Sequence, residues 1–271
     1  GYAFEVPATS NIKLADPIPL KGLGRFNHEA VAVDPKSGVV YLTEDVYDGL
    51  FYRFVPKRYG KLHQGGRLEA LAIRDRTRAD TRNWPGISRG RFPMQKPMEV
   101  AWIPLEDIDS PNDDLRIRGY GAGAAKFARG EGIWFGDGEL YFACTNGGRI
   151  QSGQVFRYKP SPFEGTAKEK NEPGLLELFI EPNNKNVLEY CDNLTIAPWG
   201  DIILCEDKYE PHIVGVTPQG KFYRLAKNVG FESEFAGVTF SPDATTMFVN
   251  IQYAGLTFAI TGPWSEGYQA S

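Results

Sequence analysis

Short apolar segments separated by turn-forming residues recur along the whole chain. The first clear pair is His28–Asp34 and Val39–Asp45, which are joined by a turn that contains Pro35 and Gly38. The first segment opens at polar residues and becomes apolar, and the second is apolar with a polar end. This arrangement predicts two antiparallel strands joined by a tight turn.

The same pair of segments occurs three more times. The copies lie at 131–135 with 139–146, at 192–196 with 201–207, and at 236–240 with 246–250. A third segment follows at 49–56, 153–160 and 212–218, and a fourth at 67–73, 175–180 and 221–225. Four antiparallel strands per unit, with a buried first strand, are the plan of a β-propeller blade. The repeat therefore predicts an all-β propeller and makes a β-sandwich with chance similarity the weaker interpretation.

The whole chain, 1–271, is expected to form one propeller domain of about four units and a half blade. Residues 1–7 match the third-strand pattern and 11–15 are expected to be a fourth strand, so the chain begins within a blade. Either the C-terminal strands complete that blade, or N-terminal strands are missing. The Arg-rich segment 74–97 is expected to be a solvated surface insertion that leads into one extra strand at 98–103.

Composition excludes several classes of protein. The chain has 42% hydrophobic residues, enough for a sizeable core, and a formal net charge of −4 that is spread along the sequence. A nucleic-acid-binding or anionic-membrane-binding surface is not expected from this balance. No stretch reaches the ~20 apolar residues of a membrane helix. The protein is expected to be a monomer. Three cysteines without zinc spacing do not form a disulfide scaffold.

Acidic residues open the first segments of the repeat. In a propeller the first strands surround a central channel, so the residues that open them share one mouth of it. These positions hold Glu29, Glu131 and Asp192, and Glu234 lies two residues before the fourth copy. Carboxylates gathered at one axis repel each other unless cations neutralise them. Oxygen ligands suit Ca²⁺ above all, and several carboxylates also suit Fe³⁺ or Mn²⁺. The alternative is that these acids are solvated loop residues.

Further polar residues are expected to surround these ligands as outer residues or to form hydrogen bonds within loops. They are His28, Glu44, Asp45, Asn193, Glu206 and Asp207.

The segment Arg129–Gly132 places a fixed positive charge two residues from a predicted metal ligand. Because a guanidinium group presents a planar fork of donors, Arg129 beside Glu131 predicts a binding site for a phosphate or carboxylate group. The alternative is an ordinary ion pair between these two residues of one strand.

Several of these motifs together resemble the PhoX-type alkaline phosphatases. The resemblance runs from Gly1 to about Trp264 and is carried by the segments Gly24–Asp34, Tyr41–Asp45, Arg129–Ile133 and Phe248–Gln252. It implies a six-bladed propeller, exported through the twin-arginine route to the periplasm or the medium, with iron and calcium ions that bind small phosphate monoesters.

The resemblance also implies roles for individual residues. Glu29, Glu131, Asp192 and Glu234 are similar to metal ligands, and Arg129 to the phosphate-binding arginine. Arg129 and Glu131 are therefore the predicted catalytic residues.

The chain departs from the family pattern in one blade. An N-terminal blade with an iron-bridging cysteine is absent, and Cys191 matches a later blade, so it is not assigned that role. The leading hypothesis is a metal-dependent phosphomonoesterase or the C-terminal part of one. Two alternatives stay open: a calcium-dependent lactonase or sugar-acid hydrolase, and a non-catalytic calcium-binding propeller.

Overall fold

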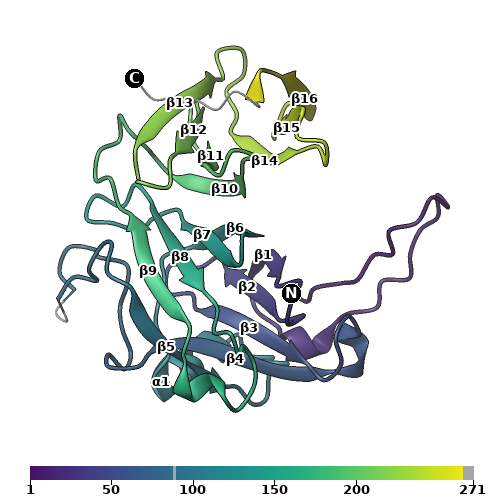
Figure 1. Cartoon of the computed structure of the whole chain (residues 1–271), viewed down its shortest axis with the longest axis vertical. Helices are drawn as coiled ribbons and strands as arrows, with labels where there is room; N and C mark the ends of the chain where they lie inside the picture. The colour runs from purple at the N-terminus through teal and green to yellow at the C-terminus, as the bar shows by residue number, and fades with distance from the viewer. Residues whose placement is uncertain (88–89, 265–271) are drawn as a thin grey trace.

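The computed structural model describes residues 1–87 and 90–264, and most of its regular structure is antiparallel β-sheet (Figure 1). The strands form four successive units. The first unit contains β1 (His28–Val33), β2 (Val40–Glu44), β3 (Phe51–Pro56), β4 (Gly66–Ile73) and β5 (Met98–Pro104). The second contains β6 (Gly130–Gly136), β7 (Glu139–Cys144), β8 (Gln154–Lys159) and β9 (Leu175–Ile180).

The third and fourth units follow directly along the chain. The third contains β10 (Cys191–Ile196), β11 (Ile202–Glu206), β12 (His212–Val216) and β13 (Phe222–Lys227), and the fourth contains β14 (Phe235–Phe240), β15 (Thr246–Ile251) and β16 (Leu256–Thr261). The helical segments are short: η1 (Lys21–Leu23), η2 (Leu62–Gln64), α1 (Leu115–Ala122) and η3 (Glu169–Asn171). No helix in the described part of the chain has the length and apolar character that crossing a membrane requires.

The tight turn between β6 and β7 shows how the sequence forms these hairpins. Asp137 and Gly138 are the only residues between the strands, and both have positive φ angles, 52° and 78°. Two-residue turns of this kind match the twist of the flanking strands, and the second position favours glycine. The corresponding turn in the first unit is held by Asp34, whose carboxylate accepts hydrogen bonds from Lys36 N and Ser37 Oγ.

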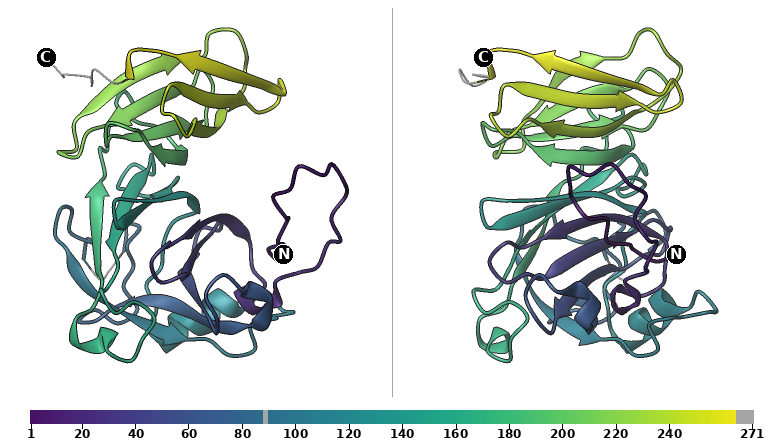
Figure 2. Two further views of the ribbon diagram at one scale, coloured as in Figure 1. Left: turned by 45° about the vertical axis from the view of Figure 1, so that its right-hand side comes forward. Right: turned by 90° about the vertical axis from the view of Figure 1, so that its right-hand side faces the viewer.

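The units are arranged as an arc with their first strands on the inner side (Figures 1 and 2). β1 contacts β6, β6 contacts β10, and β10 contacts β14. The first two units are joined into one nine-stranded sheet because β5 pairs with β9 at Met98–Leu176 and Glu99–Leu175. The third and fourth units are separate sheets of four and three strands. This succession of radial antiparallel sheets confirms the predicted β-propeller architecture.

Apolar layers fill the spaces between neighbouring units. Phe51 of the first unit stacks on Phe142 of the second, with ring centroids 4.3 Å apart. Leu194 and Leu204 belong to the cluster that joins the second and third units, and Met247 to the cluster between the third and fourth. β6 and β10 are thus fixed by packing on both neighbouring units, and β1 and β14 by packing on one, which holds the ends of these strands in a defined arrangement.

The N-terminal segments differ from expectation. Residues 1–7 and 11–15 form no strand, and one isolated bridge joins Phe4 to Pro19. A strand needs a neighbour for its backbone hydrogen bonds, and the chain between the paired residues Phe4 and Pro19 instead projects from the first unit as a loop (Figure 1). The prediction of two strands here is wrong, and Ile12 and Leu14 are fully exposed.

The segment 74–97 leaves β4 and returns as β5, the extra strand that the sequence predicts. Parts of it are more buried than a solvated insertion would be, since Ala79, Thr81 and Phe92 are inaccessible to water. The side chain of Asn83 bonds to the backbone of Phe92 and to Glu181, which follows β9. The segment therefore packs against the second unit as well as covering the first.

Candidate metal centre

Every inner strand contains a β-bulge near its start. In each unit two residues of the inner strand lie opposite one residue of the next strand, because the register shifts between 28 and 31, 130 and 133, 191 and 194, and 236 and 239. A bulge bends the strand locally and redirects its side chains. The first residue within the bulge is Glu29, Glu131, Asp192 and Gly237 in the four units. Three of the four units therefore present a carboxylate at the same structural position.

These carboxylates converge in two groups. Oxygen atoms of Glu29, Glu131 and Asp192 lie within 4.8 Å of one another, and so do those of Asp192, Asp207 and Glu234. Asp192 belongs to both groups. Glu131 is buried, Asp192 is half-buried and Glu29 is exposed. The four ligands predicted from the sequence are thus brought together, with Glu234 supplied from just before β14 rather than from its bulge.

Burial, together with mutual repulsion, shifts the pKa values of these acids upward. Burial, followed by repulsion from Asp192, Asp45 and Glu29, raises the pKa of Glu131 to about 10, although Arg129 opposes the shift. Burial and a hydrogen bond with Asp207 raise the pKa of Glu234 to about 8. Ionised carboxylates this close are unfavourable without a compensating positive charge.

The donor set fits a hard multivalent cation. All donors in both groups are carboxylate oxygens, which is the chemistry that Ca²⁺ and Fe³⁺ accept. Cysteine does not take part: Cys191 is buried, and its thiol donates to the backbone oxygen of Gln154 at 3.5 Å.

Arg129 lies at the edge of the first group. Its Nε and Nη2 atoms donate to the two carboxylate oxygens of Asp45 at 2.7 and 3.2 Å, and Nη2 also donates to Glu131 at 2.7 Å. The ion pair between Arg129 and Glu131 that the sequence allowed is present. The guanidinium group also lies beside the carboxylate centre, and its role in binding an anion stays a prediction. The Nη1 atom makes one long hydrogen bond, 3.4 Å, to Asn146. This nitrogen is therefore the donor most available to an added anion.

The acids at the ends of the second strands have two different functions. Asp207 belongs to the second carboxylate group, and Asp45, at the corresponding position of the first unit, orients Arg129. Glu44 and Glu206, one residue earlier, point elsewhere. Each accepts a hydrogen bond from a backbone N–H six residues later, Leu50 at 3.0 Å and His212 at 2.9 Å. These two glutamates fix the loops that lead into β3 and β12.

His28 and Asn193 also take structural positions. The imidazole of His28 stacks on Phe26, with ring centroids 3.6 Å apart, and its Nε2 is 3.0 Å from the carbonyl oxygen of Gly24. Burial lowers the pKa of His28. Asn193 is the second residue of its bulge, and its backbone lies directly against Gly132.

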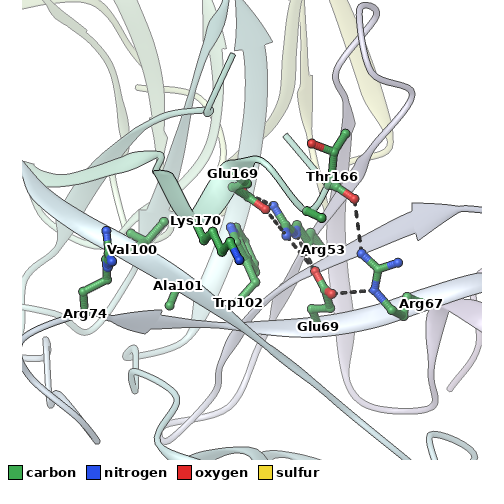
Figure 3. Close-up of a pocket in the computed structure, with 12 residues that line it drawn as sticks. Arg53, Arg67, Glu69, Arg74, Val100, Ala101, Trp102, Thr166, Glu169 and Lys170 are labelled. Atoms are coloured by element: carbon green, nitrogen blue, oxygen red, sulfur yellow. Dashed lines mark hydrogen bonds and ion pairs between the residues drawn. The ribbon is translucent and has the colours of Figure 1, made fainter. Parts of the chain in front are cut away.

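A cavity of about 580 Å³ shares no residue with the carboxylate groups (Figure 3). It lies against β3, β4, β5 and the segment 165–170, and the guanidinium group of Arg53 stacks on Trp102 in its wall. Arg53 is already paired with Glu69, Glu164 and Glu169. The positive charge of Arg53 is thus neutralised by these glutamates, and the group is not a good binding partner for a ligand.

The fold and the carboxylate centre define a β-propeller with a candidate metal site at the inner strands and an arginine beside it. The chain belongs to the alkaline phosphatase PhoX family, whose model matches residues 1–255. No curated protein matches the chain.

Two solved structures place this family membership in context. One is Pseudomonas fluorescens PhoX in complex with vanadate, a transition state analogue, with 20% identity and a TM-score of 0.65 over 88% of this chain and 50% of that one. This chain therefore spans half the length of the Pseudomonas protein, and the likeness supports the propeller fold. The other is a gluconolactonase from Xanthomonas campestris, XC5397, with 12% identity, a TM-score of 0.33 and coverage of 83% and 69%. With this low TM-score, the second match supports no conclusion about the fold or function of this chain.

Proposed function

We propose that this chain provides the metal- and phosphate-binding part of an alkaline phosphatase that hydrolyses small phosphate monoesters. One observation carries the proposal: carboxylates from three units converge beside an arginine whose Nη1 atom is only weakly bonded. Membership of the PhoX family supports it, and a periplasmic or secreted location is part of the same proposal.

In this function Glu29, Glu131, Asp192, Asp207 and Glu234 would hold Ca²⁺ and Fe³⁺. Cations bound there would neutralise the negative charge that develops on the phosphoryl group. Arg129 would donate from Nη1 to a phosphate oxygen, and Asp45 would keep the guanidinium in place through two hydrogen bonds. If Glu131 bound a cation in place of Arg129, the Nη2 atom of Arg129 would become a second donor for the anion.

Substitution of these two central residues tests the proposal. Glu131→Gln is expected to lower cation binding, and Arg129→Ala to lower phosphate affinity while leaving cation binding intact. Each is expected to reduce kcat/KM for an aryl phosphate by roughly a hundredfold or more, as the loss of a charge-stabilising group does elsewhere. The measurements are metal content, calorimetric binding of inorganic phosphate, and initial rates with supplied Ca²⁺ and Fe³⁺.

Matched controls lie in the same unit. Arg157 and Glu177 form an ion pair, with side-chain exposures of 33% and 8%, close to the 25% and 3% of Arg129 and Glu131. Arg157→Ala and Glu177→Gln are expected to leave metal content and turnover unchanged. Equal losses in both pairs of variants would contradict the proposal, as would turnover of a lactone without turnover of a phosphate ester.

A further inference from the structure

A second, smaller cavity adjoins the carboxylate centre. It has a volume of about 190 Å³ and lies between the segment that follows β11, the residues before β14 and the turn that follows β15. Asp207 and Glu234 line this cavity and also belong to the second carboxylate group. A group bound at the centre therefore has this cavity as its immediate neighbour.

Two exposed tyrosines line the cavity from different units. Tyr209 of the third unit is 76% exposed and Tyr253 of the fourth is 84% exposed. The backbone N–H of Tyr253 donates to Ser233 Oγ at 2.9 Å, which fixes the position of its turn beside the cavity. Large aromatic side chains at the edge of a cavity provide flat surfaces on which another ring can stack.

The charges around this cavity disfavour a second anionic group. Lys208, the cation of its lining, is bound to Glu206 at 3.2 Å and to Glu189 at 3.5 Å. In the proposed function Asp207 and Glu234 are ligands of the cations, and Glu232 adds a further negative charge to the lining. Because Lys208 is already paired and Glu232 repels an anion, an uncharged ring suits the cavity better than a further phosphate or carboxylate.

From these observations we infer that the Tyr209–Tyr253 cavity receives the alcohol part of the substrate and selects phosphate monoesters of uncharged aromatic alcohols. This inference rests on the proposed phosphatase function, because it takes the carboxylate centre as the place of the phosphate. The volume of the cavity is below the ~300 Å³ of ordinary drug-sized sites and corresponds to a single small ring. The tyrosines act as specificity residues, which contact the leaving group and not the reacting atoms.

The test compares two esters and two phosphonates that cannot be hydrolysed. Tyr209→Ala and Tyr253→Ala are each expected to lower kcat/KM for phenyl phosphate by roughly three- to tenfold, mainly through KM, which is the usual size of one ring contact. The value for glycerol phosphate is expected to change by less than about twofold, because that ester has no ring to stack. Calorimetry is expected to show the same selective loss for phenylphosphonate against methylphosphonate. Tyr209→Phe and Tyr253→Phe are expected to retain the preference, since stacking needs the ring and not the hydroxyl.

Tyr47→Ala is the matched control. Tyr47 is also an exposed tyrosine, 63% accessible, in a segment that follows a second strand, but it does not line this cavity. Equal changes for the aromatic and aliphatic ligands, or no change for either, would overturn the inference while leaving the proposed function in place. Failure of the unmodified chain to bind either metal or inorganic phosphate would overturn the proposed function. The comparison of the two phosphonates would still test the preference for a ring. If the chain bound neither phosphonate, the inference about the Tyr209–Tyr253 cavity would be overturned.

Discussion

The buried carboxylate of Glu44 connects the local structure of one loop with the stability of the protein. One of its oxygens accepts hydrogen bonds from Leu50 N and from the hydroxyl of Tyr52, and the other is buried without a partner among the described residues. Burial raises the pKa of Glu44 from 4.5 to about 7, and the two hydrogen bonds only partly oppose this shift. The folded protein therefore binds a proton at pH values where the unfolded chain has lost it.

This difference predicts a specific pH dependence of stability. The stabilisation linked to protonated Glu44 is complete below pH 4.5 and is lost as the pH rises to about 7. A shift of this size corresponds to roughly 3 kcal/mol. In Glu44→Gln, the free energy of unfolding measured by urea titration is expected to fall less between pH 5 and pH 8 than in the unmodified chain. Equal falls would contradict the assignment, and Glu210→Gln reports the effect of removing one exposed carboxylate.

The site residues were most readily predictable where the repeat itself carried the signal. Glu29, Glu131 and Asp192 occupy equivalent positions of three units, so the repeat and the idea of a common channel were sufficient to group them. Asp207 was expected only as an outer residue, although it lies within the second group. Its carboxylate and that of Asp45 follow equivalent strands but meet different neighbours, the carboxylates of Asp192 and Glu234 in one case and Arg129 in the other, and local sequence does not specify such neighbours.

At the scale of the elements, the bulges determine how closely the inner strands approach. A Cβ atom placed on Gly132, in the bulge of β6, would lie 2.8 Å from the Cα of Asn193 and from the backbone oxygen of Asp192. The backbones of β6 and β10 are thus in direct contact at the point where Glu131 and Asp192 converge. The absence of a side chain on Gly132 is what allows this contact.

Gly132→Ala is therefore expected to push β6 and β10 apart. Overpacking of this kind costs roughly 1–3 kcal/mol of unfolding free energy, and cation binding is expected to weaken because the ligands lie on the two displaced strands. Thermal unfolding and metal titration check both effects. Gly121→Ala is the control, because a Cβ on Gly121 in α1 would meet nothing within 4 Å; equal behaviour of the two variants would contradict the explanation.

The strands themselves followed the hydrophobic pattern closely, for a physical reason. Within the repeat, each predicted segment pairs with at least one neighbouring strand that completes backbone hydrogen bonds, as β7 does with β6 and β8. The segments 1–7 and 11–15 carry a similar pattern without a neighbouring strand, apart from the isolated Phe4–Pro19 bridge, and form no strand. The bulges were not predictable, because inserting one residue changes the register without changing the composition of the strand.

For the whole molecule, a buried ionic cluster joins the first two units at a distance from the inner strands. Arg53 of β3, 2% exposed, pairs with Glu69 of β4 and with Glu169 from the segment between β8 and β9 (Figure 3). It also pairs with Glu164 of the same segment. Since the cluster includes more carboxylates than arginines, removal of the central cation leaves buried negative charge uncompensated.

Arg53→Ala is expected to lower the free energy of unfolding by about 3–5 kcal/mol, the usual cost of breaking a buried ion pair on one side. Arg67 also bonds to Glu69, but its side chain is 53% exposed. Arg67→Ala is therefore expected to cost less than about 1 kcal/mol. Urea unfolding gives the free energy of unfolding of each variant. Similar losses for Arg53→Ala and Arg67→Ala would contradict the prediction that the buried Arg53 contributes more to stability.

Asp192 gives the arc a property that no single unit has. Its carboxylate is shared by the group that includes Glu131 of the second unit and the group that includes Glu234 beside the fourth. Two cations held there would draw on one common ligand, so occupancy of one position changes the affinity of the other. By thermodynamic reciprocity the second would change the first by the same factor. The third unit would then couple its two neighbours energetically, and a titration with metal is expected to report one linked binding process in place of two independent ones.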